Sequence, residues 1–340
     1  MARLFKRFHP AFGMIRTRKR IQGTKAKPAK TKLRKRTVNL MEKQDQLDAV
    51  TRMQQYIEQH MEQSVSLEEV ARAGGYSIRH AKRIFREYTG KTLSDYIRRM
   101  QMTAAAKRLA EKEETILEVA LSSQYESHEG FIKAFAATFG LTPSKYRKEK
   151  PPVPYFVPYP VKHQYFFRQN RGGNTMNKEI NTCTATYTDR PKRKLIYQPS
   201  NTASDYMTYC QEKGCEWEGL LNSIEEKFDT AAILTLPEEL AKGGSSRCAA
   251  GVEVPENYQA EIPEGYHITD LPAATMLYIQ SQPYENEDDF MEAIETVYQA
   301  YLTYRPESFG YEYAPETAPA FNFGAYAASG ARMAFPVKKK

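Results

Sequence analysis

Residues 66–90 read SLEEVARAGGYSIRHAKRIFREYTG, and this stretch decides the fold of the N-terminal half of the chain. Ser66 and Glu69 stand three residues apart, which is the spacing of a capping box at the start of a helix. Gly74 and Gly75 end that helix, because glycine adopts the left-handed backbone conformation at little cost. The pattern therefore predicts a short helix that stops in a tight turn.

A second helix is expected directly after the turn, with Ser77 as its cap and Gly90 at its end. Its apolar side is formed by Ile78, Ala81, Ile84, Phe85 and Tyr88, and its outer side by Arg79, His80, Lys82, Arg83 and Arg86. Two short helices joined by a glycine turn, the second with a basic outer face, are typical of a helix-turn-helix.

The same unit is written twice in the sequence. Glu69-Val70-Ala71 recurs 49 residues later as Glu118-Val119-Ala120, and Phe85, Gly90, Thr92 and Tyr96 recur 50 residues later as Phe135, Gly140, Thr142 and Tyr146. Between the copies, apolar residues from Leu93 to Leu109 mark a long amphipathic helix. Because successive major-groove faces of B-DNA lie about 34 Å apart, such a rigid pair suits two adjacent grooves without dimerisation.

Residues 47–148 closely resemble the DNA-binding domain of the AraC/XylS family. The most specific part is the run Phe131-x-x-x-Phe135-x-x-x-Phe139-Gly140-Leu141-Thr142-Pro143-Ser144-Lys145-Tyr146-Arg147. The resemblance implies a transcriptional activator with double-stranded DNA and RNA polymerase as partners. It also implies that bases are contacted by the outer faces of two recognition helices, here Arg79, His80, Lys82, Arg83, His128, Glu129 and Lys133.

The second copy departs from the usual pattern of that family. Gly130 stands inside the expected recognition helix, where glycine costs about 0.5–1 kcal/mol relative to alanine. Glu126 and Glu129 add negative charge on a surface that faces phosphates. A glutamate accepts a hydrogen bond from cytosine N4, so Glu129 is either a base contact or a sign that the second unit binds loosely.

The charge divides the chain into unlike regions. Residues 1–41 hold 14 Lys and Arg and no Asp or Glu, and we expect a disordered tail that binds DNA nonspecifically, unless translation begins at Met41. Residues 42–150, the predicted DNA-binding domain, hold 18 basic and 16 acidic residues. Residues 151–340 hold 17 basic and 25 acidic residues, a net charge of −8.

A proline-rich linker over residues 151–177 is predicted from its first ten residues, PPVPYFVPYP. Prolines at this density exclude a continuing helix and favour a stiff extended chain. Residues 178–340 would then form a second domain in which the order strand, helix, strand, strand occurs twice. The expected strands are 195–197, 231–236 and 248–254, then 275–279, 320–323 and 332–338. The chain is thus predicted to be multidomain: an all-α double helix-turn-helix, then a duplicated α+β sandwich with pseudo-two-fold symmetry.

This second domain resembles the GyrI-like effector-binding domain. The resemblance rests on Ala250-Gly251-Val252-Glu253-Val254, on Tyr266 followed by Leu271-Pro272-Ala273, and on the closing Phe335-Pro336-Val337-Lys338. It implies a small lipophilic or cationic effector in an aromatic pocket with a buried acid, although Arg332 stands near the position where that acid commonly lies. Glu216, Glu218, Glu253 and Glu312 are the substitutes considered. The candidate effector-binding residues are Trp217, Glu253, Tyr278, Tyr311, Glu312 and Arg332.

Other function classes find little support in the sequence. No stretch approaches the roughly 18 apolar residues of a membrane span, and no signal peptide opens the chain, so we expect a cytoplasmic protein without membrane partners. The four cysteines and six histidines form no metal-ligand pattern, and no cofactor or catalytic set is indicated. Two alternatives stay open: a C-terminal domain that hydrolyses reactive small molecules, and an architectural DNA-binding protein without an effector.

Overall fold

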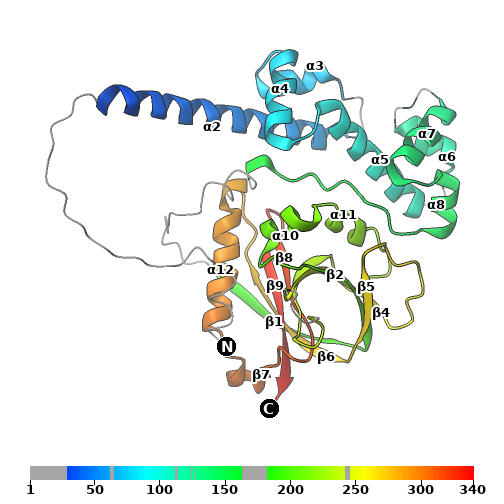
Figure 1. Cartoon of the computed structure of the whole chain (residues 1–340), viewed down its shortest axis with the longest axis vertical. Coiled ribbons are helices and arrows are strands. Elements are labelled where there is room, and N and C mark those ends of the chain that lie inside the picture. The colour runs from blue at the N-terminus through cyan, green and yellow to red at the C-terminus, as the bar shows by residue number, and fades with distance from the viewer. Residues whose placement is uncertain are drawn as a thin grey trace. The chain divides into compact units, whose positions relative to one another are not determined.

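The computed structural model describes residues 29–61, 65–111, 114–123, 125, 127–162, 182–241 and 246–340, and their side chains from residue 42 onward except that of Glu287. The chain divides into two units (Figure 1). Among the described residues, one comprises those of 29–134 with 158–162, and the other comprises 135–157 and those of 182–340. Helices make up the first unit, and an antiparallel sheet with helices packed on it makes up most of the second.

Seven helices precede the linker in the described part of the chain. They are α2 (Ala29–Gln59), α3 (Leu67–Gly74), α4 (Ile78–Thr89), α5 (Leu93–Glu111), α6 (Ile116–Ser122), α7 (His128–Phe139) and α8 (Pro143–Glu149). Helix α2 begins at Ala29, inside the stretch of residues 1–41 that was expected to be a disordered tail. Residues 29–59 contain neither glycine nor proline and are rich in Lys, Arg, Leu, Met and Gln, all good helix formers. Residues 1–28 lie outside the described range.

Helix α3 is fixed at both ends by hydrogen bonds, one set at its start and two at the turn that ends it. The capping box of Ser66 and Glu69 is confirmed at the start of the helix. Gly75 takes the left-handed conformation with φ of 78°, and its N–H donates to carbonyls at the end of α3. Arg52 of α2 donates from Nε and Nη2 to the carbonyls of Ala73 and Gly74, at 3.2 and 3.1 Å. Because these bonds fix α3 and the turn after it, they also fix the point at which α4 begins.

The predicted cap of α4 differs from the structure. Ser77 occupies the cap position in the extended conformation, but its side chain makes no capping hydrogen bond. The Ser77 hydroxyl therefore does not stabilise the first turn of α4. The helix is stabilised mainly by the packing of its apolar side, where Ala81, Ile84 and Phe85 are fully buried. In the second copy, Thr115 and Glu118 form a complete capping box at the start of α6.

The C-terminal sheet has nine strands: β1 (Cys183–Arg190), β2 (Arg193–Pro199), β3 (Ala232–Thr235), β4 (Cys248–Pro255), β5 (His267–Leu271), β6 (Ala274–Ser281), β7 (Tyr311–Tyr313), β8 (Ala320–Tyr326) and β9 (Gly330–Lys339). All pairings are antiparallel, in the order β1-β6-β9-β8-β3-β4-β2-β5, with β7 beside β9. The six predicted strands are present, whereas β1, β5 and β7 were not predicted. The strands form one continuous curved sheet (Figure 1) and not two stacked layers.

Helices cover one face of this sheet. Helices α10 (Tyr206–Lys213) and α11 (Trp217–Asn222) share a core with alternate residues of β2, β3 and β4, such as Ile196 and Val252. Helix α12 (Phe290–Thr303) packs on β6 and β9 through Val297. The opposite face carries a separate apolar cluster that runs across both halves of the sheet: Leu195, Tyr197, Ala232, Leu234, Leu236, Ala249, Leu271, Met276, Ala318, Phe321, Phe323 and Ala334.

The first half of the linker is docked on the sheet domain. Residues 151–160 are extended, as predicted, but Val153 is buried and its N–H donates to the Ser223 hydroxyl at 2.9 Å. Lys150 pairs with Glu225 at 3.0 Å, and the hydroxyls of Tyr146 and Tyr155 are 2.7 Å apart. These contacts lie within the unit that comprises residues 135–157 and the sheet.

The described part of the second half of the linker is docked on the helical unit. Buried Gln54 of α2 accepts from the Val161 N–H at 3.0 Å and donates to the Tyr159 carbonyl at 2.8 Å. The same amide also donates to the Tyr96 hydroxyl at 3.0 Å. The linker therefore changes unit between Val157 and Pro158, which no feature of its composition indicates. Residues 163–177 of the predicted linker lie outside the described range.

Gly219 of α11 provides a test of the docked linker. A Cβ at this position would lie 1.7 Å from the Tyr155 carbonyl oxygen. Glycine to alanine normally stabilises a helix by about 0.5–1 kcal/mol, but overpacking against backbone costs about 1–3 kcal/mol. We expect Gly219→Ala to lower the free energy of unfolding, measured by urea titration with the fluorescence of Trp217, the only tryptophan. Unchanged or higher stability would contradict docking at this point.

Candidate DNA-binding surface and effector site

Helix α4 presents a basic surface to solvent. Arg79, Lys82, Arg83 and Arg86 are exposed and follow one another at helical spacing, so they share one side of the helix. The other side is buried in the core of the helical unit. This segregation holds four cations on the face of a short, rigid helix, as a duplex-binding recognition helix requires.

Local contacts already orient part of this surface. Arg83 Nη1 lies 3.1 Å from the Glu87 carboxylate, and both side chains are more than half exposed, at 56% and 57%. The His80 ring stacks on Tyr76 with centroids 4.5 Å apart, and its Nε2 lies 3.4 Å from Arg83 Nη2. An exposed ion pair contributes only about 0–1 kcal/mol, so Arg83 can exchange Glu87 for a nucleic-acid acceptor at small cost.

Helix α7 presents a mixed surface. His128, Glu129 and Lys133 are exposed, and Phe131 and Phe135 on the opposite side are buried. All three candidates of α7 are thus open to solvent. The α7 surface carries one lysine and one glutamate where α4 carries four cations, so the two helices differ in their electrostatic attraction for phosphates.

Gly130 has a structural role that the sequence did not reveal. It is the third residue of α7, and its N–H donates to the Ser127 hydroxyl at 3.1 Å. A Cβ on Gly130 would meet that hydroxyl at 3.0 Å, so a side chain here would crowd the hydrogen bond that begins the helix. The glycine thus accommodates a capping interaction in the first turn. Glu126, the other departure noted in this copy, lies outside the described residues.

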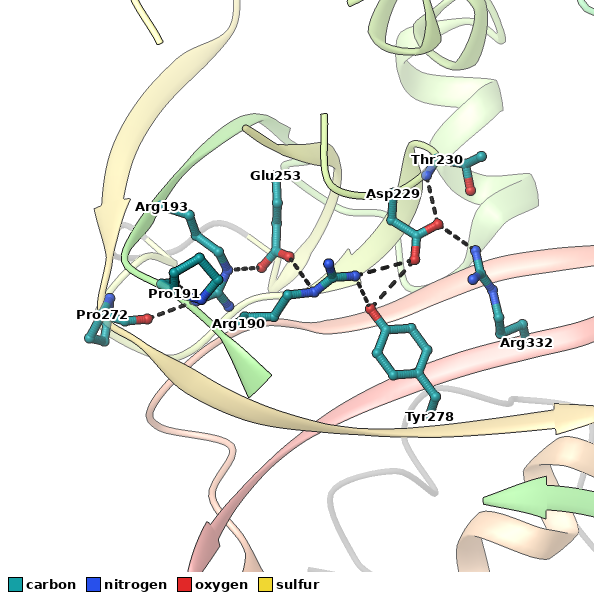
Figure 2. A network of polar contacts seen from close by, with 9 residues as sticks. All are labelled: Arg190, Pro191, Arg193, Asp229, Thr230, Glu253, Pro272, Tyr278 and Arg332. Atoms are coloured by element: carbon teal, nitrogen blue, oxygen red, sulfur yellow. Dashed lines mark hydrogen bonds and ion pairs between the residues drawn. The ribbon is translucent and has the colours of Figure 1, made fainter. Parts of the chain in front are cut away.

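Three of the six effector candidates meet in one polar network on the sheet (Figure 2). Glu253 of β4, Tyr278 of β6 and Arg332 of β9 are joined through Arg190 of β1 and Asp229, which precedes β3. Cross-strand partners share a face of a sheet, and the register places these strand residues on the face that carries the second apolar cluster.

The buried end of the network is an ion pair. Arg193 Nε donates to Glu253 at 2.6 Å, and the two side chains are 0% and 4% exposed. Arg193 also donates to the Pro272 carbonyl at 2.7 Å. Burial raises the pKa of the Glu253 carboxyl, and the adjacent Arg193 and Arg190 oppose that shift. Glu253 does not point to solvent, because its side chain is 4% exposed, and β4 lies between β3 and β2.

The outer end of the network is built around Asp229. Its two oxygens reach two guanidinium groups, with Arg332 Nη2 at 2.6 Å and Arg190 Nη2 at 3.5 Å. The Tyr278 hydroxyl accepts from Arg190 at 2.5 Å and donates to Asp229 at 3.4 Å. These groups are partly exposed, Arg332 at 29%, so solvent reaches this end of the network.

Aromatic rings line the same two arginines. The Arg332 guanidinium lies 4.2 Å from the centre of the Phe323 ring, which stacks parallel to Tyr278. The Arg190 guanidinium lies 5.4 Å from the ring of Phe228 and 5.7 Å from that of Tyr278. The protein's own cations therefore occupy these aromatic faces.

The other effector candidates lie elsewhere. Trp217 is buried under the opposite face of the sheet, in edge contact with Tyr206 and Tyr209 at 6.0 Å. Tyr311 of β7 stacks on Tyr187 at 4.4 Å, and Glu312 pairs with Lys338 at 3.5 Å on the surface. The sequence thus identified three members of the network and three residues that the structure does not bring to it.

Sequence reasoning missed Arg190, Arg193 and Asp229. Arg190 and Arg193 flank the turn between β1 and β2, and β1 itself was not predicted. Asp229 belongs to an irregular segment, where no periodic pattern marks it as buried. The pairing of β1 with β6 and of β6 with β9 creates the site, and this pairing is a property of the sheet that no local motif encodes.

The described residues also bear on metal binding and on membrane insertion. Among the described residues, no group of three or more His, Cys, Asp or Glu has the arrangement of a metal site. In that same part of the chain, no helix is both long and apolar enough to cross a membrane.

Glu218 was one of the residues considered as a substitute for the buried acid of an effector pocket. It is buried and accepts a hydrogen bond from the Tyr326 hydroxyl at 2.8 Å.

Comparison with known proteins adds independent evidence for the helical region. The profile of the helix-turn-helix domain family matches residues 52–149. The Transposon Tn10 TetD protein of Escherichia coli is 41% identical over 95 residues, which are 28% of this chain and 69% of that protein. The HTH-type transcriptional activator AarP of Providencia stuartii is 37% identical over 92 residues, 27% of this chain and 68% of AarP.

The regulatory protein SoxS of Escherichia coli K12 is 37% identical over 92 residues, which are 27% of this chain and 86% of SoxS. These matches take in most of each relative, and their length agrees with the predicted double unit. The matched residues include both recognition helices, α4 and α7. The chain therefore belongs to the AraC family of helix-turn-helix transcriptional regulators.

Proposed function

We propose that this chain is a sequence-specific transcriptional regulator in which α4 supplies most of the base and phosphate contacts and α7 supplies a weaker second set. The observation that carries the proposal is the exposed row of Arg79, Lys82, Arg83 and Arg86 on α4. Arginine pairs with both acceptors of guanine in the major groove, and lysine neutralises phosphates. The mixed charge of His128, Glu129 and Lys133 supports the weaker role of α7.

We propose further that the regulator acts as an activator that contacts RNA polymerase. Support comes from the relative AarP, whose name describes it as a transcriptional activator. The hypothesis of a purely architectural DNA-binding protein is less well supported, because the matched relatives include regulators by name. Nothing in the comparisons supports the hydrolase alternative.

The second domain is proposed to bind a small lipophilic effector at the polar network around Asp229. The two strand triplets β2-β4-β3 and β6-β9-β8 have the same order and meet along β3 and β8, which supports a duplicated origin. The network lies across that junction, beside the apolar cluster that both halves share. Seams between repeated halves are common places for small-molecule sites.

Replacing Arg83 tests the role of α4. Arg83→Ala is expected to weaken binding to a selected operator by about 1–3 kcal/mol more than binding to random DNA, because a bidentate guanine contact is lost. Glu87→Ala is the matched control: it removes the partner of Arg83 but keeps the cation, so operator binding should stay equal or tighten. Fluorescence titrations at one salt concentration measure the affinity of each variant for operator and for random DNA. An equal loss of binding free energy on operator and random DNA would mean that Arg83 contacts a phosphate and not a base.

The duplicated unit predicts that one chain occupies one operator. Helix α5, with 19 residues, extends about 28 Å and links the two helix pairs within one chain. We expect native mass spectrometry of the full chain on operator DNA to show one chain per duplex at limiting protein. If every complex contained two chains per duplex, the proposal that a single chain reads two grooves would be contradicted.

Effector binding is tested by thermal unfolding of the full chain with three matched compounds: biphenylcarboxylate, biphenylmethanol and biphenylmethylammonium. A compound at 100 times its Kd stabilises the folded state by about 2.7 kcal/mol, so a bound member should raise the Tm. The proposal of an effector site predicts that at least one compound does so. If none raises the Tm at any soluble concentration, the lipophilic effector site is refuted.

A further inference from the structure

The segment between α11 and β3 carries a carboxylate that bridges two strands. Asp229 reaches Arg332 on β9 and Arg190 on β1, and these strands flank β6, which carries Tyr278 (Figure 2). Each oxygen of the carboxylate faces a different guanidinium group. A small carboxylate ligand would make the same two contacts, because charge-assisted pairs of this kind are the strongest hydrogen bonds available to an arginine.

The charges at this site oppose a cationic ligand. The network holds three arginines, Arg190, Arg193 and Arg332, and two carboxylates, Asp229 and Glu253, so one positive charge is in excess. The rings that would attract a cation already face Arg190 and Arg332. A cationic ligand would have to compete with groups that are covalently attached to the sheet.

The two carboxylates differ in how firmly they are held. Glu253 is 4% exposed and tied to a fully buried arginine, whereas Asp229 is 19% exposed and lies on an irregular segment. Exchanging Asp229 for a ligand carboxylate would conserve the charge between the two arginines. Exchanging Glu253 would leave Arg193 buried without its partner, at a much larger cost.

We propose that Arg190 and Arg332 form a clamp for the carboxylate of a lipophilic effector, and that Asp229 occupies this clamp in the absence of the ligand. The inference rests on the effector function proposed above and departs from the cation expected from the sequence. Phe323 and Tyr278 lie directly beside the clamp, next to the apolar cluster of the same face, and they would pack against the lipophilic body. Asp229 then acts as an internal competitor that sets the ligand concentration required.

The test measures the affinity of the full chain for biphenylcarboxylate by calorimetry, with biphenylmethylammonium as the counterpart of opposite charge. Arg332→Gln is expected to lower the affinity for biphenylcarboxylate about 10- to 100-fold, the size of a lost charge-assisted hydrogen bond. Asp229→Asn is expected to raise this affinity several-fold, because the competing charge is removed. A gain in affinity cannot arise from misfolding, so this variant keeps the test valid if Arg332→Gln is unstable.

Lys338→Gln is the matched control, since Lys338 is also a cation on β9 but pairs with Glu312 and Glu316 at the surface. It should leave the affinity unchanged. Equal carboxylate affinity in the wild type, Arg332→Gln and Asp229→Asn would overturn the clamp, as would binding of the ammonium compound alone. In both cases a ligand still binds, and the effector function survives. Binding of neither charged compound nor of neutral biphenylmethanol would overturn the effector function together with the clamp.

Discussion

The left-handed turn at Gly75 determines where the basic surface of α4 lies. This turn is held by Arg52 of α2, which donates to the last two carbonyls of α3. A backbone with φ of 78° at this point excludes most side chains without strain. Because Ser77 adds no capping bond, the orientation of Arg79, Lys82 and Arg83 depends on this turn and on core packing.

The sheet domain depends on a comparable constraint, the register of β1, β6 and β9. A shift by one residue in any of these pairings would move Arg190, Tyr278 or Arg332 to the opposite face, under the helices. The fully buried pair of Arg193 and Glu253 fixes the neighbouring strands in the same way, because an unpaired charge there would be costly. Charged residues from β1, β2, β4, β9 and the segment before β3 thus meet at one place.

Much of the helical region could be predicted, because its signals are local. Capping residues, glycine stops and apolar spacing placed α3, α4 and α7 within a residue or two of their positions in the structure. The polar network around Asp229 was predicted only in part. Glu253, Tyr278 and Arg332 were identified, but Asp229 and Arg190 become neighbours only through strand pairing, and the docking of Val153 on Ser223 leaves no mark in the composition of the linker.

The central claim is that one chain presents two recognition helices of unequal strength to adjacent major grooves. Methylation protection of guanine N7 on operator DNA, with the full chain bound, tests it most directly. The account predicts two protected clusters about 10 base pairs apart on one side of the duplex, with stronger protection in the cluster contacted by α4. Protection confined to a single major groove, or two clusters of equal strength that require two bound chains, would contradict it.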